Sequence, residues 1–494
     1  MDRYIKVHSA AQIGLKNKVI TSIRPLYAII IFGGLIGSLF SAVIIVKTDR
    51  AGEYFLYFLL PLGFAIFLIC TLFCNSKIQN KNVFIIFVGL YFIKLVITPA
   101  VSAMSGWYAL AKGEGYLDYL SEAILLTVWE PVFIGALLMI YTNSREYRIK
   151  SNFLKEYGIK FDGADLLIII ATLFVVGTLL YYPPLRVRVA WLLTIETNEA
   201  VTPVVRSWRD FFTANGRQLP LGIIDTLMMK TFYIIRVLFP LMLIEKIYHQ
   251  NWRWRKKAFL SLFIVLLCAQ VTTEANGETI LMAIGLILLL FMIYPKLYES
   301  CGKAIIMFGV VVAGMLFALK VKGSSGDTQS DVTFIQSISA TMNAYMNGPV
   351  NLAIAIKAKE NYNMFMGIEE ILGGLPILNR FFSGYQTSTI FNEAFWGMKG
   401  RTDQLLPALG QGYMYFGSVF APIVQFFFII WGLGLEDLSE KAESIKVKGY
   451  FIFMAVLVIW TIGNNLSHVM SFFIRYFPGI IILYFKKYRV KVKS

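Results

Sequence analysis

The sequence predicts an all-α, polytopic membrane protein with about twelve transmembrane helices, both termini in the cytoplasm and two enlarged extracytoplasmic loops. Its composition is the first observation behind this fold class. Hydrophobic side chains make up 57% of the 494 residues, charged side chains make up 15%, and the mean hydropathy is +0.64. Soluble domains are typically about 45–50% apolar and about 25% charged, so the apolar surplus must face lipid. An ordinary soluble enzyme is therefore excluded.

Long apolar stretches are the second observation. A helix needs about 20 apolar residues to cross roughly 30 Å of hydrocarbon. Twelve stretches approach this length, and five of them are short enough that one could be re-entrant. Their approximate bounds are 26–46, 54–74, 83–103, 121–141, 164–182, 223–245, 258–271, 280–294, 304–319, 409–433, 450–463 and 470–485. The first is too long for a signal peptide and no small-residue cleavage site follows it, so we expect it to remain as a membrane helix.

The distribution of basic residues is the third observation. Alternating the connections from a cytoplasmic N-terminus places 27 Lys and Arg residues inside and three in the short outer turns. Basic residues near short loops resist translocation, so both ends of the chain are expected in the cytoplasm. The net charge of +16 is then a topology signal, and no nucleic-acid partner is expected.

Two outer segments, 183–222 and 320–408, enlarge what is otherwise a single integral membrane domain over 1–494. In the second segment, 332–360 has a helical period with a turn near 347–349, so two helices are expected there. Glycine and proline punctuate the following stretch, 373–397, between large apolar side chains. That stretch could pack on the bilayer surface or form the loop's own small core.

The shorter outer segment is rich in arginine, with Arg206 and Arg209 three residues apart among five arginines. The planar guanidinium group of arginine forms two parallel hydrogen bonds to phosphate or carboxylate. A concentration of arginines therefore favours an anionic ligand on the outer face. Contact of a surface helix with lipid headgroups is the alternative.

Ionisable residues inside spans are costly and are functional hypotheses by default, with charge pairing between helices as the alternative. They are Lys94, Glu122, Glu130, Lys230, Arg236 and Arg475. Lys230 and Arg475 would add positive potential beneath the outer arginines. Glu278 lies at the same level, in the turn before the eighth span.

Motifs for metal, nucleotide or Ser-His chemistry are missing. The chain has no HExxH, paired CxxC, G-x-S-x-G, P-loop or dinucleotide-binding motif, and it has only three histidines. Neither a metal nor a cofactor is expected. Chemistry at the outer face must therefore use carboxylates, arginines and lysines on a substrate that arrives already activated.

Several strings resemble the O-antigen polymerase (Wzy-type) family of oligosaccharide repeat-unit polymerases, which have about a dozen spans and two enlarged outer loops. The similar strings are MMKTFYIIRVLFPLMLIEKIY (228–248), ANGETILMAIGLILLLFMIYPK (275–296), ALKVKG (318–323), AYMNGPVNLAIAIKAKEN (344–361) and LGQGYMYFGSVFAPI (409–423). Arg401 with Gly412 also fits an Arg-x10-Gly spacing of some members. One departure is that the family often has arginine before the eighth span, where this chain has Glu274 and Glu278.

The resemblance implies a metal-independent glycosyltransferase in the bacterial cytoplasmic (inner) membrane. It would polymerise undecaprenyl-pyrophosphate-linked oligosaccharides into O-antigen, capsule or exopolysaccharide, next to membrane lipid and with a chain-length regulator and a flippase as partners. Fixed cations would stabilise the departing pyrophosphate, and a carboxylate would accept the proton of the acceptor hydroxyl.

Residues can be assigned to these roles. Pyrophosphate recognition falls to Arg206, Arg209, Arg380, Arg401, Lys230 and Lys322, the candidate bases are Glu393, Asp403 and Glu278, and sugar stacking falls to Tyr345, Tyr385, Trp396 and Tyr413. Interfacial anchoring is an equal explanation for outer aromatic residues.

Two other functions compete with this one. An O-antigen ligase generally carries a histidine in the large outer loop, and 320–408 contains none. A transporter or flippase would predict inverted repeats and charges spread through the middle of the membrane, whereas no internal repeat is visible and polar residues are denser at the outer face.

Overall fold

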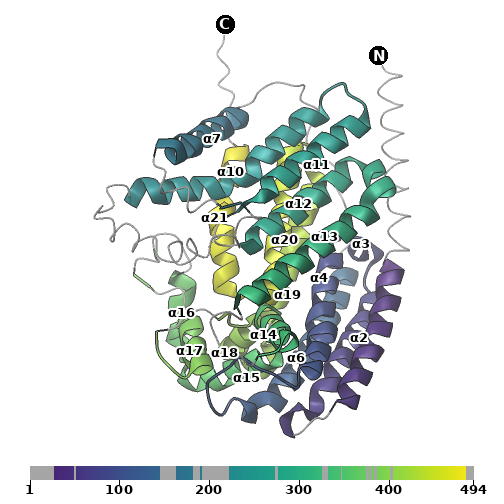
Figure 1. Cartoon of the computed structure of the whole chain (residues 1–494), viewed down its shortest axis with the longest axis vertical. Helices are drawn as coiled ribbons and strands as arrows, with labels where there is room; N and C mark the ends of the chain where they lie inside the picture. The colour runs from purple at the N-terminus through teal and green to yellow at the C-terminus, as the bar shows by residue number, and fades with distance from the viewer. Residues whose placement is uncertain are drawn as a thin grey trace. The chain divides into compact units, whose positions relative to one another are not determined.

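The computed structural model describes twelve stretches of the chain. They are residues 27–48, 52–144, 163–181, 190–191, 222–272, 276–324, 332–346, 348–373, 378, 381–382, 386–400 and 404–484. Almost all of their regular structure is helical (Figure 1). The exception within these stretches is an antiparallel pairing of two short strands, β1 (Ala190–Trp191) and β2 (Val271–Thr272). The predicted all-α class is confirmed.

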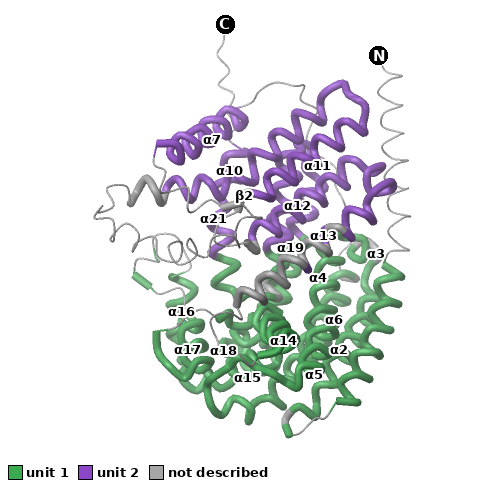
Figure 2. The backbone as a smooth tube through the Cα atoms, viewed as in Figure 1, with its two compact units in different colours: residues 1–149, 320–433, 458–470 green, residues 150–319, 434–457, 471–494 purple. Residues whose placement is uncertain are grey.

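The chain divides into two compact units, coloured separately in Figure 2. Unit 1 comprises 1–149, 320–433 and 458–470, and unit 2 comprises 150–319, 434–457 and 471–494. The large outer loop of the sequence thus packs with the first four predicted spans.

Unit 1 is built from N-terminal helices and from the helices of the large loop. The first group is a helix at Tyr27–Lys47, η1 (Gly52–Phe58), α2 (Leu59–Leu72), α3 (Ser76–Gln79), α4 (Asn82–Phe92), a π-helical turn η2 (Ile93–Ile97), α5 (Thr98–Met104), η3 (Leu117–Tyr119) and α6 (Leu120–Ser144). The second group is α14 (Phe334–Tyr345), α15 (Pro349–Ala358), η6 (Lys359–Asn361), α16 (Met364–Gly373), α17 (Gln386–Trp396), α18 (Ala408–Phe420), the first half of α19 (Ile423–Lys441), and η8 (Trp460–Gly463).

Small residues let α2 and α6 pack closely. A Cβ atom added at Gly63 would lie 3.3 Å from a methyl carbon of Val128, and one added at Gly135 would lie 2.9 Å from Cβ of Cys70. Glycine at such crossings is typical of membrane helices, where close backbone approach increases van der Waals contact.

The two helices expected at 332–360 are confirmed, with their turn in the predicted place. Thr333 and Gln336 form a reciprocal capping box that starts α14. Gly348 precedes α15, and Pro349 occupies its first turn, where the missing N–H costs nothing. α15 is buried at every position but Lys357, so it forms part of the core of unit 1.

The predicted span 409–433 is not one straight helix, because the chain bends by 107° between α18 and α19. Gly417 has a φ of +74°, and Pro422 precedes the second helix without an N–H to donate. A Cβ atom at Gly412 would lie 2.0 Å from the carbonyl oxygen of Ala421. The bend therefore depends on a glycine at 412.

Replacing Gly412 by alanine should destabilise the protein by about 3 kcal/mol, the upper end of the usual cost of overpacking. The cost is high because the added Cβ atom meets a backbone atom, which cannot move aside as a side chain can. The measurement is the melting temperature in detergent. Gly434→Ala is the matched control, since nothing lies within 4 Å of the Cβ atom it would add. Equal melting temperatures for the two variants would contradict the role assigned to Gly412.

Unit 2 contains most of the remaining described helices. They are α7 (Gly163–Tyr181), α10 (Gly222–Tyr248), α11 (Trp254–Gln270), α12 (Asn276–Ile293), α13 (Pro295–Ser324) as far as Leu319, most of α20 (Ile445–Ile459), and α21 (Leu466–Tyr484) from Ser471. α10 packs against α7 through a cluster of buried apolar residues that includes Met228 and Phe232. Cys301 lies within α13.

Ion pairs join α7, α10 and α20 in this unit. The Lys446 ammonium contacts the carboxylate of Asp165, and Lys246 lies 2.6 Å from its other oxygen. Glu245 accepts hydrogen bonds from Ser444 Oγ and from the backbone N–H of Ile445, which satisfies donors at the start of α20. These charges compensate one another and have a structural role.

Several helices are long and apolar enough to cross a membrane, so the protein is membrane-embedded. Among the described residues seven helical segments qualify: Tyr27–Lys47, Tyr54–Leu72, Asn82–Met104, Leu117–Thr142, Gly163–Tyr181, Leu227–Tyr248 and Leu466–Tyr484. The bent pair α18 and α19 makes an eighth if counted as one span, and α12 contains a shorter apolar helix. The count of twelve, the orientation, the outer loops and the single domain stay predictions.

Candidate functional site

Six of the thirteen residues assigned to a role in the reaction lie outside the described residues. These are Arg206, Arg209, Arg380, Arg401, Asp403 and Tyr385. Lys322 lies in α13, but its side chain is outside the description. The predicted pyrophosphate site thus rests, within the described structure, on Lys230 alone, which is exposed on α10.

The described members of the predicted set are divided between the two units. Glu393 is half-buried near the end of α17, where its carbonyl accepts the N–H of Gly397. Trp396 is 7% exposed and packs edge-to-face on Phe395, so its ring is part of the core. Tyr345, at the end of α14, is half-buried. Their assigned roles stay predictions.

Tyr413 of α18 belongs to a polar surface of unit 1. Its hydroxyl donates a 2.9 Å hydrogen bond to Glu122 of α6, and the Lys359 ammonium lies 4.1 Å from its ring centroid. Beside them the Tyr119 hydroxyl donates to Glu360. The sequence analysis placed Glu122 inside a span, and the structure gives it a tyrosine partner.

A second group of charges in unit 2 joins three helices, and we call it the arginine cluster: Arg236, Glu278, Arg475, Tyr233 and Tyr476. Arg236 comes from α10, Glu278 from the first turn of α12, and Arg475 from α21. Arg236 Nη2 lies 2.7 Å from Glu278 Oε2, and Arg475 Nη1 contacts Glu278 Oε1. One carboxylate therefore holds two guanidinium groups.

The two tyrosines complete the arginine cluster. The Tyr476 hydroxyl accepts from Arg236 Nη2 at 2.8 Å and donates to Glu278 Oε2 at 2.6 Å. Both guanidinium groups contact the ring of Tyr233, with Cζ 5.2 Å from its centroid for Arg236 and 4.4 Å for Arg475. Such cation–π contacts stabilise positive charge without neutralising it.

Among the described residues, the arginine cluster carries a formal charge of +1 between α10, α12 and α21, because two guanidinium groups face one carboxylate. Glu278 and Arg236 are both about 2% exposed, whereas the Arg475 side chain is 27% exposed. Buried charge is normally balanced, since desolvating an unpaired ion is expensive. A partly exposed guanidinium with donors to spare is therefore suited to an anionic ligand.

Glu278 was predicted as a candidate base, but its contacts favour another role. Its two oxygens face guanidinium groups, which do not release protons at physiological pH, and a tyrosine hydroxyl. We interpret Glu278 as the residue that positions both arginines. Its base role stays untested.

Unit 1 contains a second polar site, the Glu370 network: Glu370, Thr387, Tyr415, Ser467 and Gln411. Glu370 of α16 is 2% exposed. Its Oε2 accepts hydrogen bonds from Thr387 Oγ1 at 2.5 Å and from the Tyr415 hydroxyl at 2.8 Å, and its Oε1 accepts from Ser467 Oγ at 2.5 Å. No ion pair to Glu370 occurs among the described residues.

Gln411 fixes the direction of these hydrogen bonds. Its amide nitrogen donates to Tyr415 at 3.0 Å and to Ser467 at 3.3 Å, while its oxygen accepts the N–H of Leu466 at 2.7 Å. With the amide donating to their oxygens, the hydroxyl hydrogens are free to point at Glu370. The three hydroxyl groups of the network, on Thr387, Tyr415 and Ser467, therefore all donate to Glu370.

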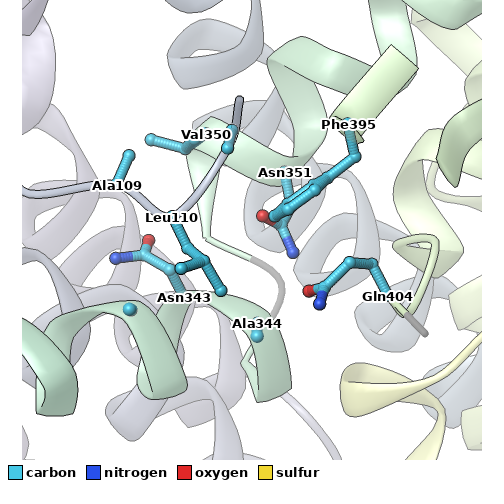
Figure 3. A pocket seen from close by; sticks show the side chains of 10 residues that line it. Ala109, Leu110, Asn343, Ala344, Val350, Asn351, Phe395 and Gln404 are labelled. Carbon is cyan, nitrogen blue, oxygen red and sulfur yellow. The ribbon is translucent and has the colours of Figure 1, made fainter. Parts of the chain in front are cut away.

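A small cavity lies elsewhere in unit 1, between α14, α15 and α17 (Figure 3). Its lining includes Asn343, Asn351, Phe395 and Gln404, and it has room for about one water molecule. Asn343 Oδ1 and Asn351 Nδ2 are buried without a hydrogen-bond partner in the described structure. One acceptor and one donor suit a bridging water, and the space is too small for a sugar ring.

Lys94 and Glu130 form a buried ion pair between predicted spans of unit 1, both at most 3% exposed. Lys94 lies in the π-helical turn η2, a local irregularity that often occurs at functional sites. These two intramembrane charges are therefore paired between helices.

Metal-binding side chains do not gather in the described stretches: within them no group of three or more His, Cys, Asp or Glu residues is placed to hold an ion. The sites above are thus made of guanidinium, carboxylate, hydroxyl and amide groups.

Sequence reasoning identified part of these sites. Arg236 and Arg475 were marked as charges within spans and Glu278 as an acid at a turn, but nothing in the sequence indicated that they meet. Glu370 was missed, because it follows another glutamate in a loop of mixed charge. Its one available signal is a helical period that places it opposite the apolar face of 364–372.

Comparison with known proteins adds no relative: the chain matches no protein-family model, no curated protein and no solved structure.

Proposed function

We propose that this chain polymerises oligosaccharide repeat units carried on undecaprenyl pyrophosphate, as a metal-independent glycosyltransferase at the outer face of a bacterial cytoplasmic membrane. The observation that carries the proposal is the arginine cluster, which sets an excess guanidinium group, Arg475, within membrane-spanning helices. A lipid-linked donor brings its pyrophosphate to the membrane, where such a group can bind it. The family strings described above support the same activity.

The proposed transfer has a balanced chemistry. The acceptor hydroxyl oxygen forms a bond to the anomeric carbon of the donor, and the bond from that carbon to pyrophosphate breaks. Its electron pair leaves with the phosphate oxygen, where negative charge grows and Arg475 stabilises it. The products are a longer glycan on one carrier and free undecaprenyl pyrophosphate.

The proton of the acceptor hydroxyl needs a destination. Within unit 1, Glu370 is a proton acceptor of suitable geometry, reached through Tyr415: the tyrosine oxygen takes a proton while its own passes to Glu370 Oε2, 2.8 Å away. Tyr415 is only half-buried, so it is the member of the network that a substrate can approach. Glu393, Asp403 and Glu278 remain alternative bases.

Deleting the gene and separating the surface polysaccharide by size tests the activity. Loss of the polymerase should leave single repeat units on the cell surface. Long chains that are made but never attached to their final acceptor would instead identify a ligase, and unchanged polysaccharide would contradict the proposal.

A transporter or flippase is the second candidate, favoured by the buried Lys94–Glu130 pair, because charges deep in a membrane often mark a transport path. The same deletion separates the two candidates. Without a flippase, neither single units nor chains would reach the outer surface.

A further inference from the structure

The helix α16 exposes its large apolar residues and buries small and polar ones. Its large apolar side chains Met364, Phe365, Ile368 and Ile371 are exposed, the first two at 77% and 78%. At 3.6 residues per turn these four positions fall within an arc of about 120°. A surface helix of a water-soluble domain would turn this face inward.

The opposite side of α16 is small and polar. Its buried residues are Gly367, Glu370 and Gly373, which occupy the opposite arc and include the carboxylate of the Glu370 network. Gly367 permits close packing, since a Cβ atom there would lie 3.1 Å from the Tyr415 ring and 2.4 Å from the Tyr362 hydroxyl. The helix is thus held by polar contacts and leaves its apolar face without protein cover among the described residues.

Neighbouring exposed residues indicate what covers this face. α18, which contacts α16 at Gly367, continues past Tyr415 with exposed Phe416 and Phe420 and belongs to the bent pair that is apolar enough to cross a membrane. In the same unit, the membrane-spanning helix Tyr27–Lys47 exposes Phe32 and Phe40 at 70% and 68%. The face of α16 therefore has the exposure of a lipid-facing helix.

Charge supports the same occupant. The only ionisable residues of α16 are Glu369 and Glu370, and both point away from the apolar arc toward partners in α17: Glu369 accepts from Gln386 Nε2 at 2.7 Å, and Glu370 from Thr387. A surface without charge or hydrogen-bond donors suits hydrocarbon, whereas a protein partner would commonly meet polar groups at its rim.

We propose that α16 lies in the bilayer with Met364, Phe365, Ile368 and Ile371 against lipid hydrocarbon. The large loop then contributes a membrane-embedded amphipathic helix, and the Glu370 network lies within one helix diameter, about 10 Å, of the lipid. This inference does not depend on the proposed activity.

Spin labels on the protein in lipid nanodiscs test the inference. Labels at Phe365→Cys and Ile368→Cys, with Cys70, Cys74, Cys268 and Cys301 replaced by alanine, are compared for collision with oxygen and with a water-soluble nickel complex. Phe40→Cys serves as the lipid-facing reference and Lys399→Cys as the exposed, charged reference. We expect both α16 labels to match position 40, with an oxygen-to-nickel ratio several-fold above that at 399.

Two results would overturn the inference: nickel accessibility like that at 399, or a label that neither reagent reaches, which would mean that protein covers the face. If the cysteine-free background fails to fold, photolabelling of the unaltered protein by a diazirine on a lipid acyl chain replaces it. Adducts on the peptide 362–373 are then the expected result, and their absence while the helix Tyr27–Lys47 is labelled contradicts the inference.

Discussion

Replacing Arg475 by alanine is expected to reduce polymerisation by about 10²–10³-fold, the typical cost of removing one preorganised group that stabilises developing negative charge. Arg475 is the partly exposed guanidinium of the arginine cluster, so its loss removes the excess positive charge while Arg236 and Glu278 remain paired. The measurement is the rate of chain extension from purified lipid-linked repeat units in proteoliposomes. Arg475→Lys should recover part of the rate, because lysine keeps the charge but lacks the planar fork.

The matched control is Arg255→Ala. Arg255 is an exposed arginine of α11 that contacts the ring of Trp254, so both variants lose a guanidinium group that lies over an aromatic side chain. A normal rate for Arg475→Ala, or an equal loss for the control, would remove Arg475 from the pyrophosphate site. Arg236→Ala is unsuitable for this purpose, because breaking a buried pair destabilises a protein by about 3–5 kcal/mol.

Glu370→Gln is expected to slow the transfer by about 10²–10⁴-fold, the usual contribution of general base catalysis, while the protein still inserts and folds. Glutamine has the same shape, but it cannot accept the proton that arrives through Tyr415. Its NH₂ group would also donate, where the carboxylate only accepts. The transfer rate reports the loss of the proton acceptor, and the melting temperature reports the altered hydrogen bonding, so both are measured on the same variant.

Glu369→Gln is the control, because the same substitution one residue earlier on α16 alters a half-buried carboxylate whose described partner is Gln386. Tyr415→Phe should show a loss similar to that of Glu370→Gln, and the wild-type rate should fall in deuterated water by a factor that both variants abolish. Full activity of Glu370→Gln would leave the network a structural role, joining α16 to α17 and α18.

The Glu370 network and the arginine cluster lie in different units, and each is described by itself. Their experiments are therefore independent: the first reports on proton transfer and the second on the leaving group. A loss in one with no loss in the other would identify which of the two sites contributes to the reaction.

Local sequence patterns predicted most helices, and they predicted the turn between the two helices at 332–360. Each of the twelve apolar stretches overlaps a helix of the structure, and Gly348 and Pro349 mark the start of α15, in the turn expected near 347–349. These features depend on residues close together in the chain, where hydropathy, caps and breakers act. The bend after α18 escaped prediction because Gly412 matters only through its approach to Ala421.

By itself, the sequence determined that this protein is helical, apolar and embedded in a membrane, because burial of apolar surface is read from composition and period. Only the tertiary structure decided which charges meet. Arg236 and Tyr476 are 240 residues apart and Glu370 and Ser467 are 97 apart, and both pairs share hydrogen-bonded sites. Ion pairs and hydrogen bonds are set by distances of a few ångströms between packed helices, and nothing local in the chain encodes them.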